Sequence, residues 1–358
     1  MYRNTKNVPY YAFGRGSLAQ LGDLLKPRRE AVDGPVVYFV DHFFRDHELI
    51  GRLPMEKGDQ LHFVDSSSEP EVTRIDAFKE AVSAADSRTP CCVVGIGGGN
   101  ALDTAKAVAN LLTNPGKAED YQGWELVKNP AVYKIGIPTL SGTGSECSRT
   151  CVLTNIPKNL KLGMNSDYTV YDQLLLDPDL LATVPRDQYF YTGIDTFMHC
   201  VESLQGSYRN AIIDAFSVRA VQLCEEIFLS DDMMSEDNRE KMMIASYIGG
   251  MAAGNVGVIH PFSAGLGVVL HVAHGLGNCL ALNVLGDIYP KEYKQFRTMI
   301  ERQGVNLPTG ICKDLTEEQY EGLYRGCIVH EKPLTNALGP DFKQILTREN
   351  LIERYKSI

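Results

Sequence analysis

The segment CCVVGIGGGNALDTAKAVANLL, residues 91–112, decides the fold that we expect. Its first six residues form an apolar run of strand length, and the stretch from Ala101 to Leu112 follows a helical pattern. Between them stand Gly97 to Gly99, where backbone amides at a helix N-terminus can approach a phosphate. Strict G-x-G-x-x-G spacing fails because Asn100 replaces the third glycine, although Asn100 can cap the helix. Nucleotide binding and a purely steric need for glycine both explain this turn.

Apolar runs alternate with helical patterns on both sides of this segment. The run from Val36 ends at Asp41, residues Thr73 to Ala85 follow a helical pattern, and a further run from Tyr133 ends at Pro138. Strands that alternate with helices indicate a parallel sheet with helices on its faces. The first half is therefore expected to be an α/β domain.

The pattern changes after Asp177-Pro178, because the remaining segments look helical and contain no convincing strand. Helices are expected over 186–204, 211–229 and 238–254, with a polar loop over 230–237. We place the boundary between Leu176 and Pro185. The fold class is an α/β N-terminal domain with a parallel Rossmann-like sheet, residues 1–180, followed by an all-α C-terminal domain, residues 181–358.

Composition narrows the class of protein. The 358 residues carry a net charge of −10 without a run of Lys or Arg, which argues against a nucleic-acid partner. The first 25 residues lack the apolar core of a signal peptide, and histidines and a proline interrupt the most apolar stretch, so no membrane association is expected. Nine cysteines without a C-x-x-C pair indicate reduced thiols. These features predict a cytoplasmic protein.

A second loop of small residues, from Pro138 to Glu146, follows the last apolar run of the first half. Ligands sit at the carboxyl ends of parallel strands, so its hydroxyls could bind phosphate or ribose, or the loop could simply cap the next helix. Asp41 could accept a hydrogen bond from a ribose 2′-hydroxyl and repel a 2′-phosphate, or act as a helix N-cap. Two glycine loops and Asp41 together favour NAD.

Asp195, His199, His260 and His274 form a possible set of metal ligands. Asp195 and His199 lie one turn apart on one face of a predicted helix, and the other two histidines are fourteen residues apart in a glycine-rich segment. Three imidazoles with one carboxylate suit Zn²⁺ or Fe²⁺ and suit Mg²⁺ or Ca²⁺ poorly. A surface Asp/His contact and two core histidines are the alternative interpretation.

Four motifs in a fixed order resemble the iron-dependent (group III) alcohol dehydrogenase family over essentially the whole chain. They are Gly-Gly-Gly-Asn-x-x-Asp-x-x-Lys, residues 97–106; Pro-Thr-x-x-Gly-Thr-Gly-Ser-Glu, residues 138–146; Gly-x-Asp-x-x-x-His, residues 193–199; and His274-Gly275. The resemblance implies a dehydroquinate synthase-like architecture, a divalent metal (Fe²⁺ or Zn²⁺) and NAD. It also implies that Asp195, His199, His260 and His274 are the metal ligands. The residues implied to bind the cofactor are Asp41, Gly97, Gly98, Gly99, Asp103, Thr139, Ser141 and Lys161.

One position departs from the family pattern. Many members carry a further histidine four residues after the first of the late pair, where it is held to help proton transfer, and this chain has Ala264 there. His271 lies three residues before His274 and is the candidate catalytic residue for that relay, with core packing as the alternative.

The expected reaction is oxidation of a primary alcohol to an aldehyde, with hydride transfer to NAD and the ion acting as a Lewis acid. The branch that the chain resembles most acts at C8 of 3-deoxy-manno-octulosonate, in the pathway to an 8-amino sugar of bacterial lipopolysaccharide. Such a sugar acid needs a cation, for which Arg149, Arg186 and Arg209 are candidates. Expected partners are this small molecule, a second copy in a homodimer and a downstream aminotransferase. A dehydroquinate-synthase-like lyase and a non-catalytic metal and nucleotide sensor are the alternatives.

Overall fold

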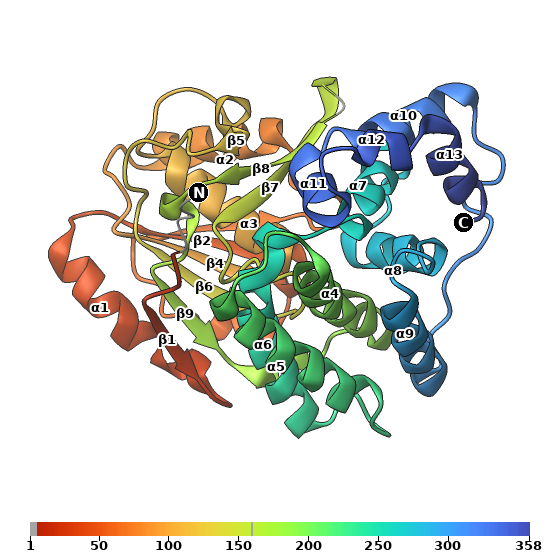
Figure 1. The fold of residues 1–358 in the computed structure, drawn as a ribbon. Helices are drawn as coiled ribbons and strands as arrows, with labels where there is room; N and C mark the ends of the chain where they lie inside the picture. Colours follow the sequence, from red (N-terminus) through yellow and green to blue (C-terminus); the bar gives the residue numbers. More distant parts are fainter. Residues whose placement is uncertain (1–5, 159) are drawn as a thin grey trace. The chain divides into compact units, whose positions relative to one another are not determined.

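A six-stranded parallel sheet organises the first of two units in the computed structural model, which describes residues 6–158 and 160–358 (Figure 1). Unit 1 comprises Met1–Leu140 and Ser145–Thr183, and unit 2 comprises Ser141–Gly144 and Val184–Ile358. The sheet order is β1-β9-β6-β4-β2-β3, and every neighbouring pair is parallel. The strands are β1 (Tyr10–Phe13), β2 (Val36–Asp41), β3 (Gln60–Val64), β4 (Cys92–Gly97), β6 (Lys134–Pro138) and β9 (Gln173–Leu176). The predicted parallel sheet is confirmed.

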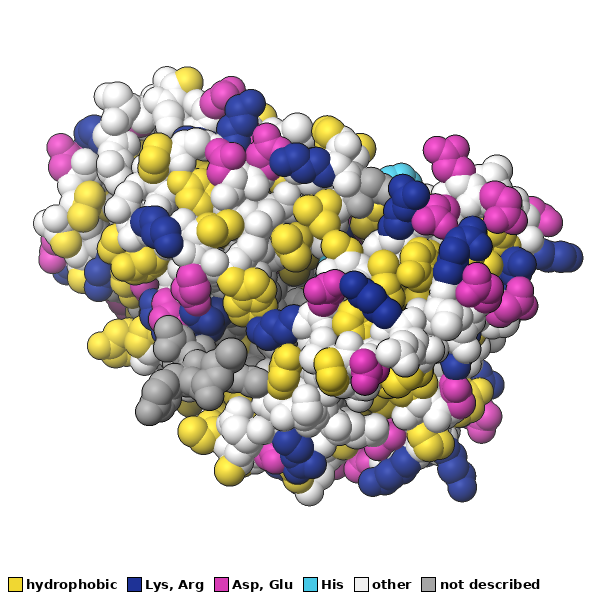
Figure 2. All heavy atoms as spheres, turned by 45° about the horizontal axis from the view of Figure 1, so that its top comes forward, with side chains coloured by type: hydrophobic (Ala, Val, Ile, Leu, Met, Phe, Trp, Pro, Cys, Tyr) yellow, Lys and Arg dark blue, Asp and Glu magenta, His cyan; other side chains and the backbone are white. Residues whose placement is uncertain are grey.

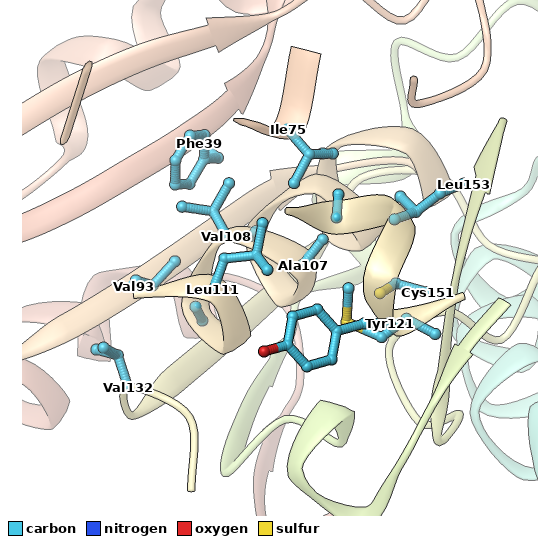
Figure 3. Packing of buried hydrophobic residues seen from close by; sticks show 14 of the residues in the cluster. Phe39, Ile75, Val93, Ala107, Val108, Leu111, Tyr121, Val132, Cys151 and Leu153 are labelled. Carbon is cyan, nitrogen blue, oxygen red and sulfur yellow. The ribbon is translucent and has the colours of Figure 1, made fainter. Parts of the chain in front are cut away.

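Helices cover both faces of this sheet because side chains alternate along its buried strands. On β2, Val37 and Phe39 pack with α2 (Val72–Ala85) and α3 (Gly99–Leu111). Tyr38 and Val40 belong to a second apolar cluster that includes α1 (Leu21–Ala31). Figure 3 shows the layer around α3, where Val108 and Leu111 point toward the sheet.

A second, three-stranded sheet of unit 1 was not expected from the sequence. Strands β7 (Thr150–Asn155) and β8 (Leu160–Asn165) pair antiparallel, and β5 (Gly123–Trp124) joins β8 in parallel. Cys151, Leu153 and Met164 belong to the same apolar cluster as α3. On β7 every second residue is buried and the others are partly exposed, a weaker apolar signal than the continuous runs of the main sheet.

Unit 2 is helical, and the residues that the structure describes in it form no strand, which confirms the expected fold class. Helix α4 packs against α5, α8 and the 3₁₀ segment η8. The helices and this segment are α4 (Arg186–Gln205), α5 (Ala211–Phe228), α6 (Glu236–Gly249), η8 (Gly250–Asn255), α7 (Ile259–Leu270), α8 (His274–Val284), α9 (Pro290–Gln303), α10 (Glu317–Ile328), α11 (Glu331–Leu338), α12 (Phe342–Ile345) and α13 (Arg348–Lys356).

Two boundaries differ from the sequence prediction. The expected loop over 230–237 ends early, because the Ser235 hydroxyl accepts from the Asn238 amide and starts α6 at Glu236. The helix expected over 238–254 is divided, since α6 ends at Gly249 and continues as the 3₁₀ turns of η8. Both corrections concern helix ends, where capping decides the boundary.

The surface carries charges of both signs. On the face drawn in Figure 2, basic and acidic side chains of the described residues are interspersed. No single helix among residues 6–158 and 160–358 has the length and hydropathy of a membrane span; only Glu236–Asn255 taken together with Ile259–Leu270 meets that test, with a 92° bend between them.

Candidate metal centre and cofactor site

Four side chains of unit 2 bring one donor atom each to a common point. Ligand atoms of Asp195, His199, His260 and His274 all lie within 4.8 Å of one another. The Nε2 atoms of His199 and His260 lie 3.7 and 3.2 Å from Asp195 Oδ1, and that of His274 lies 3.5 Å from Asp195 Oδ2. The set whose spacing suggested metal ligands in the sequence is therefore assembled in space.

Three helices position these donors. Asp195 and His199 are one turn apart on α4, which is buried at this point. His260 is the second residue of α7, and His274 is the first residue of α8. The segment that the sequence presents as a glycine-rich stretch therefore forms two successive helices whose starts each place a histidine. The rings of His199 and His260 stack with centroids 4.5 Å apart.

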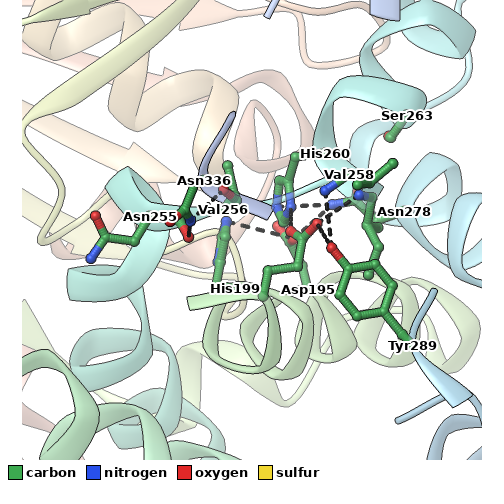
Figure 4. A network of polar contacts seen from close by, with 12 residues as sticks. Asp195, His199, Asn255, Val256, Val258, His260, Ser263, Asn278, Tyr289 and Asn336 are labelled. Atoms are coloured by element: carbon green, nitrogen blue, oxygen red, sulfur yellow. Dashed lines mark hydrogen bonds and ion pairs between the residues drawn. The ribbon is translucent and has the colours of Figure 1, made fainter. Parts of the chain in front are cut away.

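Three further residues, not predicted from the sequence, support this cluster (Figure 4). The Asn278 amide donates to Asp195 Oδ1 at 2.7 Å. The Glu202 carboxylate contacts His260 Nδ1 and accepts from the Tyr289 hydroxyl at 3.4 Å. Spacing gave a partial signal, since Asn278 lies four residues after His274 and Glu202 lies seven after Asp195, on the same helical faces.

Burial and mutual charge shift the pKa values of Asp195, His199 and His260. Burial alone would raise the pKa of Asp195, but the imidazoles of His199, His274 and His260 hold it below its usual value. Burial lowers the pKa of His199 to about 4, partly against the pull of Asp195. Burial would also lower the pKa of His260, but Glu202 and Asp195 raise it to about 9. Asp195 therefore stays an anion and His199 a neutral base, as metal coordination requires, whereas His260 must release a proton when it binds an ion.

The donor set fits a divalent transition metal. Asp195 Oδ2 and His199 Nδ1 are buried and make no hydrogen bond within the described part of the chain. A buried carboxylate oxygen without a donor is costly unless a cation or a proton satisfies it. Imidazole nitrogens with one carboxylate are the ligands that Zn²⁺ and Fe²⁺ accept. The residues that would hold such an ion are Asp195, His199, His260 and His274.

The position of the family's additional histidine carries no proton-transfer group here. Ala264 is buried on α7, one turn after His260. His271 is exposed, ends α7 and has a left-handed backbone with φ 55°. Its role in proton transfer remains a prediction.

In unit 1, the glycine run lies where β4 meets the N-terminus of α3. Gly97 has φ 151°, and a Cβ there would approach the Cβ atoms of Ala101 and Asp41 to 2.6 and 2.9 Å. The turn therefore requires glycine at this position for steric reasons as well. Gly98 is the N-cap of α3 and provides no side-chain acceptor for the first-turn amides. Those amides are suitably placed for a phosphate.

Asn100 and Asp41 bind neighbouring backbone rather than standing free. The expectation that Asn100 caps α3 is wrong, because the helix starts two residues earlier than expected, at Gly99. The Asn100 amide instead donates to the carbonyls of Ser66 and Ser68 at 3.3 and 2.9 Å. Asp41 Oδ1 accepts from the Phe43 amide at 3.0 Å and from the Ser66 hydroxyl at 2.9 Å. Asp41 thus acts as a helix cap, and its contact with a cofactor ribose stays a prediction.

Asp103 is buried and engaged on both oxygens. Its Oδ1 accepts from the Ser145 hydroxyl and lies 3.7 Å from the Lys106 ammonium, while Oδ2 accepts from the Val152 amide at 2.8 Å. Burial raises the pKa of Asp103, against the opposing charge of Lys106. This geometry indicates that Asp103 fastens α3 to β7 and to the segment before it.

The other predicted cofactor residues are also buried. Thr139 donates its amide to the Gly97 carbonyl at 3.0 Å, and Lys161 on β8 pairs with Glu69 at 3.0 Å. Ser141 belongs to unit 2, and its buried hydroxyl makes no hydrogen bond among the residues described. Gly142 explains why this loop belongs to unit 2, since its amide donates to Ser246 and its carbonyl accepts from Thr196, each at 2.8 Å.

A cavity of about 430 Å³ lies in unit 1 between β3 and α2. Its lining includes Glu69, the partner of Lys161, and Asn100 of α3. The apolar part comes from α2, including Ile75 and Phe78. Glu69, which pairs with Lys161, and Asn100, which directly follows the glycine run, therefore border a space of small-molecule size.

The three arginines considered for a substrate carboxylate all have local partners. Arg149 pairs with Asp167 at 2.5 Å and with Glu125, and Arg209 pairs with Asp214 at 2.8 Å. Arg186 donates to the side-chain oxygen of Gln303 at 2.9 Å. None of these contacts favours an arginine reserved for a sugar acid.

Comparisons with known proteins agree with this arrangement. The sequence model of iron-containing alcohol dehydrogenases matches residues 9–178, and that of the C-terminal part of the same family matches residues 189–322. Sulfoacetaldehyde reductase of Bilophila wadsworthia is 34% identical over 60% of the chain, an alignment that spans 56% of that relative's length. NAD-dependent methanol dehydrogenase of Bacillus methanolicus is 29% identical over 75% of the chain and 71% of its own length.

A solved structure shows the same fold. The sulfoacetaldehyde reductase of Bifidobacterium kashiwanohense, solved in complex with NAD⁺, superposes with a TM-score of 0.80 at 24% identity, covering 99% of this chain and 98% of the other. Together, the two sequence models span most of the chain, and both sets of residues predicted from the motifs lie inside them. The chain therefore belongs to the iron-containing alcohol dehydrogenase family.

Proposed function

We propose that the chain is a metal-dependent oxidoreductase that interconverts an alcohol and an aldehyde, with NAD as the hydride carrier. The observation that carries this proposal is the convergence of one buried carboxylate and three imidazoles in unit 2. Membership of the family supports the reaction class, and the names of the two relatives refer to an aldehyde reductase and an NAD-dependent alcohol dehydrogenase.

In this proposal one set of residues binds the ion and another binds the cofactor. Asp195, His199, His260 and His274 would hold the ion, which when bound supplies Lewis-acid chemistry to a substrate oxygen. The first turn of α3 would receive the pyrophosphate, because its amides have no side-chain cap. Asp41 would accept from the adenosine ribose through the carboxylate that already caps η2 (His42–Phe44). Thr139, Ser141 and Lys161 complete the proposed cofactor contacts, and His271 remains the candidate proton relay.

The finer part of the proposal concerns the substrate. An acidic alcohol such as 3-deoxy-manno-octulosonate, oxidised at C8, is our candidate, and the relative named for sulfoacetaldehyde also handles an acidic compound. The local pairing of Arg149, Arg186 and Arg209 means that another cation must bind the acid group. A cytoplasmic homodimer that passes its aldehyde to an aminotransferase completes this hypothesis. The family match does not favour the lyase alternative or the non-catalytic sensor.

Absorbance at the NADH band tests the proposal. The purified protein, loaded with Fe²⁺ or Zn²⁺, is assayed in both directions with NAD(H) and with pairs of neutral and acidic alcohols or aldehydes of matched length. We expect metal-dependent turnover, with higher kcat/KM for the acidic member of each pair. Equal kcat/KM for both members would exclude a preference for acidic substrates. No turnover with any pair would exclude the proposed alcohol–aldehyde reaction.

A further inference from the structure

The buried carboxylate of Glu202 lies next to the candidate ligands without being one of the converging donors. It is seven residues after Asp195 on α4, so two helical turns place both carboxylates on the same face. Its side chain is 1% exposed, and a charge at that depth requires partners.

Those partners come from the start of α7 and from the residue before α9. Glu202 Oε2 contacts His260 Nδ1, and Oε1 accepts from the Ile259 amide at 2.6 Å and from the Tyr289 hydroxyl at 3.4 Å. The Tyr289 hydroxyl in turn accepts from the Val258 amide at 3.0 Å, as the chain of contacts in Figure 4 shows. The carboxylate is therefore fixed by backbone and hydroxyl donors as well as by the imidazole.

The two stacked histidines differ in this respect. His199 Nδ1 is buried and makes no hydrogen bond within residues 6–158 and 160–358, whereas His260 Nδ1 faces a carboxylate. When His260 Nδ1 donates to Glu202, the lone pair lies on Nε2, the atom 3.2 Å from Asp195. The contact thus selects one tautomer and one ring orientation for His260. His199 has no comparable contact at Nδ1 among the described residues.

We propose that Glu202 is a positioning residue, which fixes His260 with Nε2 toward the ion and increases the affinity of the site for it. The inference rests on the metal centre proposed above. Tyr289 and the Ile259 amide donate to the same carboxylate, so its position does not depend on His260 alone. A carboxylate that accepts from a ligating imidazole makes the imidazole a better donor, and loss of such a partner typically weakens metal binding by about 10- to 100-fold.

Competition with a chromophoric chelator for Zn²⁺ tests this directly in the full-length protein. Glu202→Gln keeps the shape and one acceptor oxygen but removes the charge, so we expect affinity to fall by about tenfold. Glu202→Ala removes the acceptor as well and should lower affinity by up to about 100-fold. With Co²⁺ in place of Zn²⁺, the visible absorption bands should shift in Glu202→Ala, because a ligand that rotates changes the ligand field.

Tyr355→Phe is the matched control. The Tyr355 hydroxyl donates to the Phe262 carbonyl on α7 at 2.8 Å, so its loss loosens the helix that carries His260 without touching Glu202. We expect wild-type Zn²⁺ affinity in this variant. If its affinity falls as much as that of Glu202→Gln, the effect of Glu202 is explained by a general loosening of α7, and the proposal is overturned. Far-UV circular dichroism confirms folding, and the near-isosteric Gln variant carries the test if the Ala variant does not fold.

The outcomes separate the two proposals. Wild-type affinity and spectrum in both Glu202 variants would overturn the positioning role and leave the metal centre standing. A wild-type protein that binds neither Zn²⁺ nor Co²⁺ at this cluster would overturn both.

Discussion

Asp103 in unit 1 and Asp195 in unit 2 are both buried aspartates on long helices, and family motifs single out both, yet their surroundings are opposite. Donors surround Asp103, since a hydroxyl, a backbone amide and an ammonium face its two oxygens. Asp195 instead faces three imidazoles and one amide, and its Oδ2 makes no hydrogen bond in the described structure.

The contrast separates the carboxylate of Asp103, whose partners the chain supplies, from that of Asp195, whose neighbours suit a cation. Where the chain supplies every donor, the group fastens two segments and needs nothing else. Where lone pairs of several residues converge, the chain alone leaves the cluster incomplete, and a bound cation would satisfy all four. Burial is common to both, so the identity of the neighbours decides the role.

The largest expected effect is on turnover in His274→Ala. Loss of one ligand should remove the ion, and loss of its Lewis-acid contribution of several kcal/mol should lower kcat by at least about a thousandfold. NAD binding, followed by quenching of protein fluorescence, should stay within about twofold because the cofactor residues of unit 1 are untouched. Full activity would remove His274 from the ligand set.

Asp103→Ala should instead act on stability. The change leaves the buried Lys106 without its carboxylate and the Val152 amide without an acceptor, which should lower the free energy of unfolding by about 3 kcal/mol. Denaturant unfolding measures the loss, and chelator competition should show unchanged metal affinity. If Asp103→Ala weakens metal binding while stability is kept, the contrast between the two aspartates fails.

The convergence of Asp195 with three histidines was predictable, and the residues that surround this cluster were much less so. The four-residue spacing of Asp195 and His199 indicates that both lie on one face of a helix, and the His-Gly motif draws attention to the later histidine pair. Glu202 and Asn278 carry only the weak signal of helical spacing from Asp195 and His274, and a glutamate or an asparagine on a helix is ordinarily a solvated residue. Only the fold shows that both are buried against the histidines.

The main sheet was predictable for the same kind of reason, because its strands are continuous apolar runs. The hairpin of β7 and β8 was not, since half of β7 and four of the six residues of β8 are partly exposed. The assignment of Ser141–Gly144 to unit 2 was also beyond the sequence, because Thr196 and Ser246, which hold Gly142, lie 54 and 104 residues away.

Asp59 extends the comparison to a carboxylate whose partners are all supplied by the chain. Burial alone would raise its pKa, but Arg29 and the amides of Glu56 and Val36 hold the pKa below its usual value of 3.8. A depressed pKa means that Asp59 stabilises the fold above its ordinary pKa, and that this contribution is lost as the pH falls through the lower folded value.

Asp59→Asn should therefore cost about 2 kcal/mol of unfolding free energy at neutral pH, as for hydrogen bonds to a charged group. The difference from wild type should shrink as the pH falls below about 4. Denaturant unfolding at a series of pH values measures it, and a difference that does not change with pH would mean that the charge of Asp59 is irrelevant.

The smallest expected effect concerns Asp41→Gly. Removing a carboxylate that would repel a 2′-phosphate should shift the ratio of kcat/KM for NAD over NADP by about tenfold, or ~1.4 kcal/mol. Asp41→Ser is the control for capping, because serine can still accept from the Phe43 amide while carrying no charge. Equal selectivity in wild type and both variants would place Asp41 away from the ribose.

Metal content is the most direct test of the central claim, that Asp195 and its three histidines form a cation site whereas Asp103 is a structural fastening. Wild type, Asp195→Ala and Asp103→Ala are stripped with a chelator, reloaded with Zn²⁺ or Fe²⁺ and analysed for bound metal by mass spectrometry. We predict one ion per chain in wild type and in Asp103→Ala, and none in Asp195→Ala. A full complement of metal in Asp195→Ala, or none in the wild type, would contradict it.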